Sequence, residues 1–393
     1  GQTVTYGSPT LRFTHRTARV TVVLTDYTEE QIFVRLTGLS TENGNPAVIA
    51  PYDKGGDTYT ALVAPQTVAA GTAFITCKFT NGKVFVYKMQ SDAEWKAGEE
   101  YTYTVSLAAA EDPGYTVSED GKTYTVYTDE GLRNVAKLVN EEWKLDINIT
   151  LTGDINLTGI DWTPIGKGYN HQYTGTFDGG NYTITGLAVT GSDQYAGLFG
   201  HIGSGGTVKN VTLKDVKIES NHSSGNVGGV AGWSYGNIEY CSVSGSVSSN
   251  STAGGVVGYQ SDGAITGCNS SATVKGMVRA GGVAGATNSG ASLTGCYATG
   301  SVSVENNTTS AAYAGGVVGS NGASSTLTAC YATGSVTGSG SGTIYTGGVT
   351  GSNDLGTLTA CYHAKWTVSG PGGATGGVAG RNFKDFMFGG GII

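Results

Sequence analysis

The chain has 393 residues, of which 65 are glycine and only seven are proline. Ordinary proteins contain roughly 7 % glycine, and the glycines here follow no Gly-X-Y period, which excludes collagen. Charged residues make up only 13 %, so the chain lacks the high charge that keeps disordered proteins open. The net charge of −8 and the absence of a basic stripe argue against nucleic-acid binding. No apolar run reaches about 18 residues, so no membrane span is expected.

Residues 1–110 predict a β-sandwich. Six segments alternate apolar and polar residues, as strands with one buried face do. Clusters of Gly, Asn, Asp and Pro separate them, a spacing typical of an antiparallel sandwich. The segments are LRFTHRTARVTVVL (11–24), IFVRLTGL (32–39), TYTALVAP (58–65), TAFITCKF (72–79), KVFVYKM (83–89) and EYTYTVSL (100–107).

A second domain is expected to cover residues 111–393, after a linker at 108–114. It opens with the one convincing helix of the sequence, at 128–142, which Thr128 is expected to cap and which has acidic residues in its first turn. Its apolar stripe predicts a cap over the end of the fold that follows. The stripe consists of Leu132, Val135, Ala136 and Val139.

Repeats dominate the remainder of the chain, where residues 221–393 carry only five basic and five acidic residues. A five-residue block recurs every 26 to 34 residues, and a second block of the type LTGCYATGSV follows five of its copies. Each repeat offers about three short β segments, which bury a core only by stacking on the next repeat. The first block reads AGLFG (196–200), GGVAG (228–232), GGVVG (254–258), GGVAG (281–285), GGVVG (315–319), GGVTG (347–351) and GGVAG (376–380).

This pattern predicts a parallel β-helix with one coil per repeat, right-handed because crossovers have that strong preference. The third position of the first block is expected to form an inward aliphatic ladder, and a repeated Cys a ladder of reduced, buried thiols. The closing segment 382–393 breaks the repeat and predicts a cap or a remnant of a further coil. The ladders are Leu198, Val230, Val256, Val283, Val317, Val349 and Val378, and Cys241, Cys268, Cys296, Cys330 and Cys361.

Trp233, Tyr235 and Tyr259 are the candidate ligand-binding residues. They stand in WSYGN and YQSDGA, which predict turns at the same edge of neighbouring coils. Flat aromatic rings beside Asn and Asp are suited to sugar rings, but the simpler interpretation, which the sequence favours, is a hydrophobic stack between turns. The loops 303–314 and 337–346, with Tyr313 and Tyr345 at matching positions, are a second and weaker candidate.

The sequence resembles two known families. LRFTHRTARVTV (11–22), YTALVAPQT (59–67) and WKAGEEYTYTVSL (95–107) resemble the fimbrillin-like proteins of Bacteroides-type bacteria. Residues 196–380 are similar to GLUG-motif repeats, with AGLFG the closest copy. The resemblance implies an exported, surface-attached protein with an adhesion-type function. It brings no catalytic residue, since the GLUG motif is structural.

Enzymatic chemistry is the natural rival, because glycan-cleaving enzymes also use parallel β-helices. Such enzymes need carboxylates that share one groove, whereas the acids after residue 220 occupy no common repeat position. Asp154, Asp161 and Asp178 stand in turn-like contexts, and neither HExxH nor GxSxG occurs. We therefore expect no catalytic residue, no cofactor and no metal.

The sequence thus predicts a non-enzymatic bacterial surface protein, extracellular or on the outer membrane, that adheres through a β-helical rod. Its expected partners are glycans or proteins of host or bacterial surfaces. The alternative is a glycan-binding or glycan-cleaving β-helix. The chain begins at Gly1 without signal-peptide features, which is typical of a trimmed or mature form, and a lipid anchor on a longer precursor stays open.

Overall fold

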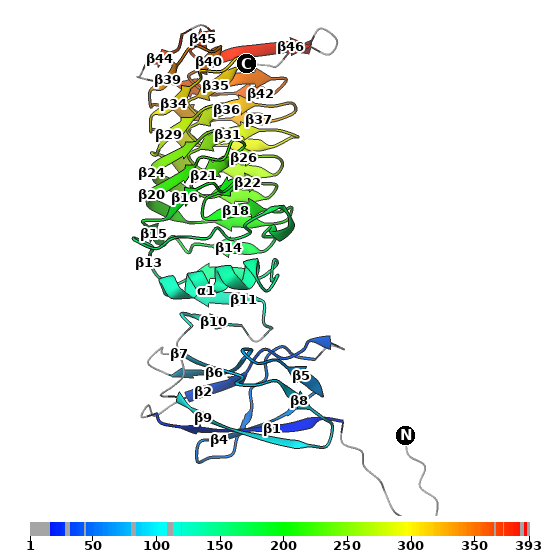
Figure 1. The fold of residues 1–393 in the computed structure, drawn as a ribbon. Helices are drawn as coiled ribbons and strands as arrows, with labels where there is room; N and C mark the ends of the chain where they lie inside the picture. The colour runs from blue at the N-terminus through cyan, green and yellow to red at the C-terminus, as the bar shows by residue number, and fades with distance from the viewer. Residues whose placement is uncertain are drawn as a thin grey trace, which may run out of the picture. The chain divides into compact units, whose positions relative to one another are not determined.

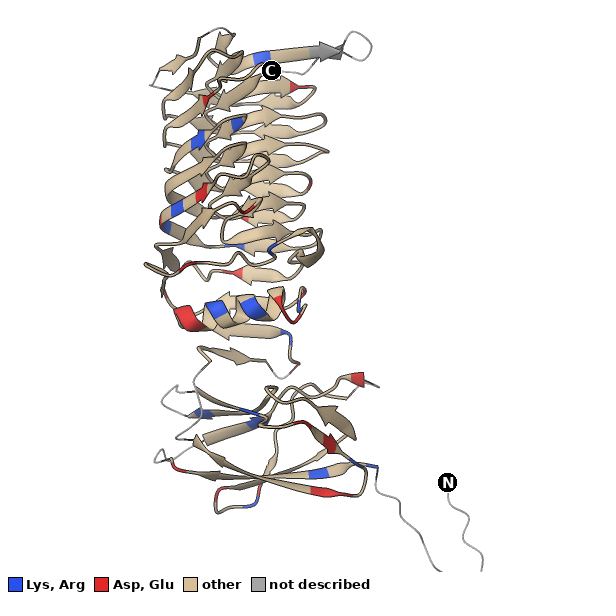
Figure 2. Ribbon diagram, viewed as in Figure 1, with Lys and Arg blue, Asp and Glu red and all other residues tan. Residues whose placement is uncertain are grey.

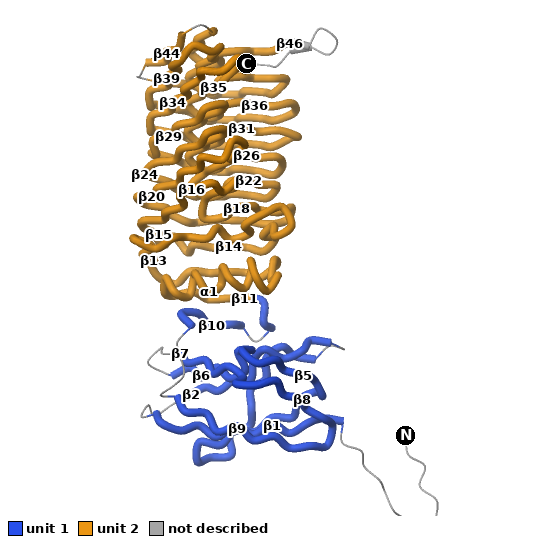
Figure 3. Tube along the Cα trace, viewed as in Figure 1, with its two compact units in different colours: residues 1–122 blue, residues 123–393 orange. Residues whose placement is uncertain are grey.

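The chain folds into two compact units, residues 1–122 and residues 123–393 (Figure 3). This division in the computed structural model lies after the expected boundary at 110/111. The structure describes residues 16–27, 32–42, 45–79, 84–107, 113–118, 120–364, 367–371, 373–385 and 389–390.

The first unit consists of three small sheets. Strand β1 pairs with β4 antiparallel and with β9 parallel, while β6 pairs antiparallel with β2 and β7. The parallel pair β1/β9 departs from the wholly antiparallel sandwich that the sequence predicts. The strands of these sheets are β1 (Ala18–Thr25), β2 (Ile32–Leu36), β3 (Tyr52–Asp53), β4 (Thr58–Val63), β5 (Gln66–Val68), β6 (Ala73–Phe79), β7 (Val84–Lys88), β8 (Ala93–Trp95) and β9 (Glu100–Ser106). Strand β10 (Tyr115–Val117) also lies among residues 1–122 but belongs to none of the three sheets.

Alternation along these strands builds one core for the first unit. In β1 every second residue is buried, so that Val20, Val22 and Leu24 face inward. Phe74 and Trp95 meet across the core with ring centroids 5.7 Å apart, and the Trp95 indole donates a hydrogen bond to the Tyr103 hydroxyl (2.9 Å). The predicted period-2 strands therefore exist where they are described; residues 11–15 of the first one lie outside the described residues.

The second unit is a parallel β-helix whose coils stack strand on strand (Figure 1). From Tyr195 onward, each coil contributes to four sheets rather than the three segments that the repeats suggest, because the second block bends and supplies two strand positions. Sheets I and II hold the two halves of that block. Sheet I contains β11 (Thr123–Val126), β12 (Asn148–Leu151), β14 (Thr176–Asp178), β19 (Thr207–Lys209), β23 (Asn237–Glu239), β27 (Ala264–Thr266), β32 (Ser292–Thr294), β37 (Thr326–Thr328) and β42 (Thr357–Thr359).

Sheet II is the broadest, because in several coils two short strands follow each other along it. It contains β13 (Ile155–Asn156), β15 (Thr183–Thr185), β16 (Ala188–Gly191), β20 (Thr212–Ser220), β24 (Ser242–Ser249), β28 (Asn269–Ser270), β29 (Thr273–Gly276), β33 (Tyr297–Ala298), β34 (Val302–Glu305), β38 (Tyr331–Ala332), β39 (Val336–Ser339), β43 (Tyr362–His363) and β44 (Val368–Ser369).

Sheets III and IV lie on either side of the glycine-rich block. Sheet III contains β17 (Tyr195–Ala196), β21 (Asn226–Gly228), β25 (Thr252–Gly254), β30 (Arg279–Gly281), β35 (Ala312–Gly315), β40 (Ile344–Gly347) and β45 (Thr375–Gly376). Sheet IV contains β18 (Phe199–Ile202), β22 (Ala231–Ser234), β26 (Val257–Gln260), β31 (Ala284–Thr287), β36 (Val318–Asn321), β41 (Thr350–Asp354), β46 (Ala379–Asp385) and β47 (Gly389–Gly390).

The block bends too sharply to carry side chains at its glycines. A Cβ on Gly281 would lie 1.9 Å from the carbonyl oxygen of Ala284, across the bend. A Cβ on Gly285 would lie 2.6 Å from the carbonyl oxygen of Gly258, in the neighbouring coil. Because no real Cβ approaches backbone that closely, only glycine permits sheets III and IV to meet at this bend.

Both predicted ladders are present inside the coils. The block residues Leu198 to Val349 are fully buried, and only Val378, in the last coil, is half-buried. The first four cysteines of the repeat are fully buried free thiols, whereas Cys361 is a free thiol that is only half-buried. The backbone N–H of Cys241 donates to the Cys268 sulfur of the next coil (3.4 Å), as expected for stacked thiols.

Helix α1 (Asp129–Asn140) caps the first coil as predicted (Figure 1). The Thr128 hydroxyl accepts a hydrogen bond from the Gly131 N–H (3.0 Å), and the expected apolar stripe is buried. Asn140, at its end, donates to the Pro164 carbonyl oxygen (2.9 Å) and accepts from the Gly166 N–H (2.9 Å). The C-terminal segment 382–393 extends β46 to Asp385, and residues 386–388 and 391–393 lie outside the described residues.

Charged side chains are sparse over the later coils (Figure 2). Inside them runs a polar ladder: the Thr287 hydroxyl donates to the Asn321 amide oxygen (2.9 Å), and the Asn321 amide donates to the Asn353 amide oxygen (2.8 Å). The three side chains are almost fully buried, so the hydrogen bonds between coils replace those that water would make.

Among the described residues, no helix has the length and apolar character needed to cross a bilayer.

Candidate functional site

One column of side chains comes directly after each glycine-rich block, on sheet IV. The strand register places these residues opposite one another in successive coils. The column begins with aromatic rings, continues with small residues and ends on an arginine. In coil order it reads His201, Trp233, Tyr259, Ala286, Ser320, Ser352 and Arg381.

A second column stands just before the block, on sheet III. The register aligns Tyr195, Asn226, Thr252, Arg279, Tyr313 and Tyr345. The bend of the block brings the two columns to one face of the coils. The Tyr195 ring lies 5.3 Å from the His201 ring, and the Arg381 guanidinium carbon lies 5.6 Å from the centre of the Tyr345 ring. We call the strip between the two columns the outer groove.

The first part of the outer groove is an aromatic stack. Trp233 and Tyr259 lie nearly parallel, with ring centroids 4.2 Å apart and an angle of 7°. His201 stacks on the other side of Trp233 at 6.1 Å and on Tyr235 at 5.7 Å. Burial lowers the pKa of His201 to about 4, so its imidazole is neutral at pH 7. The stack ends at Tyr259, because the next residue in the column is Ala286. Alanine has no ring, so the second face of the Tyr259 ring has no stacking partner in the column.

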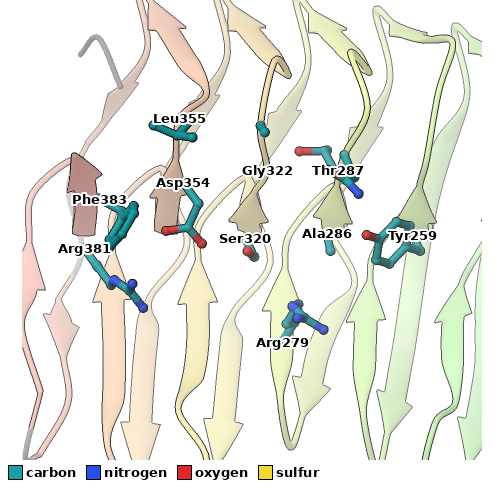
Figure 4. A pocket seen from close by; sticks show the side chains of 12 residues that line it. Tyr259, Arg279, Ala286, Thr287, Ser320, Gly322, Asp354, Leu355, Arg381 and Phe383 are labelled. Carbon is teal, nitrogen blue, oxygen red and sulfur yellow. The ribbon is translucent and has the colours of Figure 1, made fainter. Parts of the chain in front are cut away.

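A cavity of about 380 Å³ opens at this point of the outer groove. Tyr259 stands at one end, Arg381 and Phe383 stand at the other, and Arg279 and Ser320 lie between them (Figure 4). The cavity exists because Ala286, Ser320 and Ser352 are small where the preceding coils carry rings. We call it the pocket.

Three charged residues line the pocket, and none of them forms an ion pair with a described residue. Arg381 donates to the Tyr313 hydroxyl (3.2 Å) and lies over the Tyr345 and Phe383 rings, at 5.6 and 5.1 Å. Arg279 is half-buried. The Oδ1 atom of Asp354 is buried with no hydrogen-bond partner among the described residues. The pocket therefore combines aromatic surface with two guanidinium groups and one carboxylate.

The structure unites the two sites that the sequence kept apart. Trp233 and Tyr259 stack as expected, but they lie in strands β22 and β26 and not in turns. Tyr235 follows in the turn, tilted by 45° to Trp233. Tyr313 and Tyr345, predicted in loops, lie in strands β35 and β40 and stack at 5.6 Å. They belong to the same outer groove because they hold Arg381.

Sequence reasoning missed His201, Arg279, Asp354 and Arg381. A signal for three of them exists, because His201 and Arg381 are the residues directly after a block, and Arg279 stands two residues before one. Aligning the blocks would have shown both columns. Asp354 has no such signal, since it lies at the end of β41 and is placed by the strand pairing with β46.

A second aromatic ladder lies on sheet II. Tyr297, Tyr331 and Tyr362 stack at 5.0 and 5.2 Å, with their rings nearly parallel. Tyr331 is covered on both faces by its neighbours, whereas Tyr297 and Tyr362 each have a ring of this ladder on one face only, and Tyr362 is 53% exposed. The outer groove differs because one face of Tyr259 borders a cavity.

The other acidic candidates serve the backbone. Asp178 accepts hydrogen bonds from the Gly180 N–H (3.0 Å) and the Asn210 amide (3.1 Å), which is the turn role that the sequence predicts. Asp154 accepts from the Thr183 N–H (2.8 Å). Among the described residues, no group of three or more His, Cys, Asp or Glu side chains could hold a metal ion.

Two known families match segments of the chain, one in each unit. Residues 1–119 match the fimbrillin-like family, and residues 223–248 and 249–275 match the GLUG motif. The chain thus carries a fimbrillin-like domain followed by GLUG motifs, which confirms the resemblance seen in the sequence. This domain and the β-helix fit a surface protein.

Two curated relatives each match a part of this chain. Halomucin of Haloquadratum walsbyi is 30% identical over 258 residues, which cover 58% of this chain and 3% of that protein. A protein of Evansella cellulosilytica named "Putative Gly-rich membrane protein" is 34% identical over 123 residues, 30% of this chain and 14% of the relative. The chain therefore spans only a small part of either relative.

Among solved structures, the chain resembles a Bacteroides ovatus protein named a "putative immunoglobulin A1 protease". The TM-score is 0.51 at 19% identity, covering 72% of this chain and 85% of that one. At this identity the likeness concerns the fold alone.

Proposed function

We propose that this chain is the adhesive part of a bacterial cell-surface protein, extracellular or on the outer membrane, which binds surface glycans without cleaving them. The observation that carries the proposal is the outer groove, in which the Trp233–Tyr259 stack ends at an open pocket. Sugar rings bind through their apolar faces to flat aromatic rings and through their hydroxyls to polar groups at the rim. Both kinds of group line this pocket.

The remainder of the molecule supports a presenting role. A stack of coils with continuous ladders is a stiff scaffold, which holds the two columns in fixed register along several coils. The fimbrillin-like domain and the names of the relatives favour a place at the cell surface. A surface protein as partner is the other expectation from the sequence. The groove favours a glycan because the pocket combines aromatic surface with polar and charged side chains.

Cleavage of a glycan is the second candidate, because Asp354 places one carboxylate in the pocket. Glycoside hydrolysis by the usual routes uses two carboxyl groups that flank the scissile bond. The described lining of the pocket contains one. We therefore propose binding without turnover.

A glycan array probed with the intact chain tests the proposal, together with an assay for new reducing ends on the glycans that bind. We expect binding without release of reducing ends. Trp233→Ala should weaken the binding about tenfold or more, because it removes the support of Tyr259. Tyr331→Ala is the matched control, since it removes one ring from the sheet II ladder and should leave binding unchanged. Release of reducing ends would contradict the non-enzymatic part, and absence of any glycan binding would contradict the whole.

A further inference from the structure

We infer that the pocket is a subsite for a uronic acid unit, so that the outer groove selects linear glycans with free carboxylates. This inference rests on the proposed glycan-binding function and adds the class of sugar. It is carried by three features of the pocket: two guanidinium groups that form no ion pair with a described residue, a fixed position for one of them, and a carboxylate in the same lining.

The charge of the pocket favours an anion. Arg279 and Arg381 reach it from different sheets, and neither forms an ion pair with a described carboxylate. With Asp354 the three charged lining residues sum to +1, in a chain whose net charge is −8. A guanidinium binds a carboxylate with strong, charge-assisted hydrogen bonds, and it does so better where water is partly excluded. A neutral sugar would offer these groups only hydroxyl acceptors and no negative charge.

Arg381 is held in place before any ligand arrives. Its guanidinium donates to the Tyr313 hydroxyl and lies between the Tyr345 and Phe383 rings. Tyr313 and Tyr345 are themselves stacked, with centroids 5.6 Å apart and an angle of 12°. Because these contacts restrict the side chain, binding costs little further ordering. Aromatic partners also leave the positive charge uncompensated, as a carboxylate partner would not.

Asp354 supplies the opposite chemistry on the same pocket. Its Oδ1 atom is buried and has no hydrogen-bond partner among the described residues. Asp354 lines the pocket, so the accessible part of its carboxylate can accept hydrogen bonds from the hydroxyl groups of a sugar. The side chains of Asn288 and Ser320 also line the pocket and can bind further hydroxyls. A ring with one carboxylate and several hydroxyls uses all of these groups.

The spacing of the outer groove fits a linear chain of such rings. Neighbouring coils are about 4.8 Å apart, which is close to the length of one pyranose unit. Tyr259 offers its free face at one end of the pocket, and Arg381 lies at the other end (Figure 4). A sugar stacked on Tyr259 therefore places the next ring beside Arg279.

Binding of short oligogalacturonates, measured by calorimetry with the intact chain, tests the inference. Their fully methyl-esterified forms are the matched ligands, because esterification removes the charge and keeps the rings. We expect the acid to bind at least about tenfold more tightly than the ester, and its affinity to fall with added salt while that of the ester does not. Equal affinities for acid and ester would overturn the inference.

Arg279→Gln is the decisive variant, because the Arg279 side chain forms no hydrogen bond or ion pair with a described residue that the fold would lose. It should weaken binding of the acid about tenfold and leave the ester unchanged. Lys275→Gln is the control, because this variant also removes one positive charge, but from outside the pocket. Lys275 stands on β29 and forms an ion pair with Glu305 (2.8 Å). If both variants weaken binding equally, the effect is one of overall charge and the inference fails.

The two proposals fail in different ways. Binding of neutral glycans on the array, with no preference for uronates, would overturn the uronate subsite and leave the glycan-binding function intact. Binding of no glycan at all would overturn both. Preference for sulfated glycans over oligogalacturonates would also overturn the subsite, since the anion recognised would be a sulfate and not a uronate carboxylate. Preference for an acidic peptide over both would overturn it too, since it would show that the pocket recognises charge without the sugar ring.

Discussion

Arg381 donates a hydrogen bond to the hydroxyl of Tyr313, at 3.2 Å, although 68 residues separate them in the sequence. The contact crosses two coils, because Tyr313 is in register with Tyr345 of the next coil and Arg381 follows one coil later. Residues from three successive coils therefore fix one guanidinium at the end of the pocket. This arrangement is possible only in a fold whose coils stack in strict register.

Tyr313→Phe removes this hydrogen bond while it keeps the ring. We expect the affinity for oligogalacturonates to fall about three- to tenfold, because Arg381 loses its anchor, and the melting temperature to change little. Tyr345→Phe is the matched control. It keeps the ring over which the Arg381 guanidinium lies, and the hydroxyl that it removes is not the one to which Arg381 donates. Calorimetry of both variants checks the prediction, and equal losses in the two would contradict it.

Val283→Asp should damage the β-helix far more than Trp233→Ala does. Val283 is fully buried in the aliphatic ladder, so an aspartate there costs several kcal/mol or must take up a proton. Trp233 is half-buried, and its loss should cost about 1–3 kcal/mol through the stack on Tyr259.

Thermal melts of both variants, with hydrogen exchange to locate the damage, decide this prediction. Exchange should rise first in the coils next to Val283, because the stability of a solenoid is a sum of coil and neighbour terms. If Trp233→Ala melts as early as Val283→Asp, Trp233 is a core residue and the outer groove loses its aromatic support.

The cysteines should be inert to thiol reagents in the folded protein. Five of the six are fully buried, and burial raises the pKa of Cys77 to about 12, while a hydrogen bond with Cys296 is the main cause that raises that of Cys330 to about 12. The thiolate is the reactive form, so reaction at pH 8 should be slow. We expect labelling of Cys361 at most in the native protein, and of all six after denaturation. Rapid native labelling of Cys268 or Cys296 would contradict the ladder.

Acid should destabilise the β-helix through His201. Its pKa is lowered by burial to about 4, whereas an unfolded histidine titrates near 6.5. Above pH 6.5 neither state is protonated at this residue. As the pH falls from 6.5 to about 4, only the unfolded chain takes up the proton, so the free energy of unfolding decreases, by up to about 3 kcal/mol.

His201→Phe should remove this part of the pH dependence, because phenylalanine does not titrate. Chemical denaturation of both proteins at pH 7 and pH 4.5 checks it, since all other groups contribute equally to the two. The difference in stability between the two pH values should be smaller in the variant. An unchanged difference would show that His201 is protonated in the folded protein.

Periodicity predicted most of the fold, because repeated sequence forces repeated structure. The spacing of the glycine-rich block predicted the length of a coil. The repeated position of Val283 in that block, and of Cys268 in the second block, predicted two of the ladders that the structure shows. Helix α1 followed from Thr128 and an amphipathic stripe, both local signals. The number of sheets per coil was missed because the bend before the repeated Cys has no uniform sequence. Tyr240 and Ala329 adopt a positive φ there (52° and 53°), whereas Gly267 and Gly295 occupy the same position in two other coils.

The candidate site could be predicted only in part. Trp233 and Tyr259 stood out as aromatic residues at equal repeat positions, and the structure stacks them. The pocket could not be recognised in the sequence, because it is formed by two small side chains. Ala286 and Ser320 occupy, in the next two coils, the position that Tyr259 holds in its own coil. Arg279 and Arg381 come from different sheets and different coils. Only the tight bend of the block, which requires backbone contact between neighbouring coils, brings them to one hollow.

A crystal structure of the intact chain with a bound oligogalacturonate tests the central claim most directly. We predict that the sugar lies in the outer groove, with one ring stacked on the free face of Tyr259, the carboxylate of the next ring at Arg279 and that of a following ring at Arg381. A ligand bound on the sheet II ladder of Tyr297, Tyr331 and Tyr362, or on the fimbrillin-like domain, with the pocket empty, would contradict it.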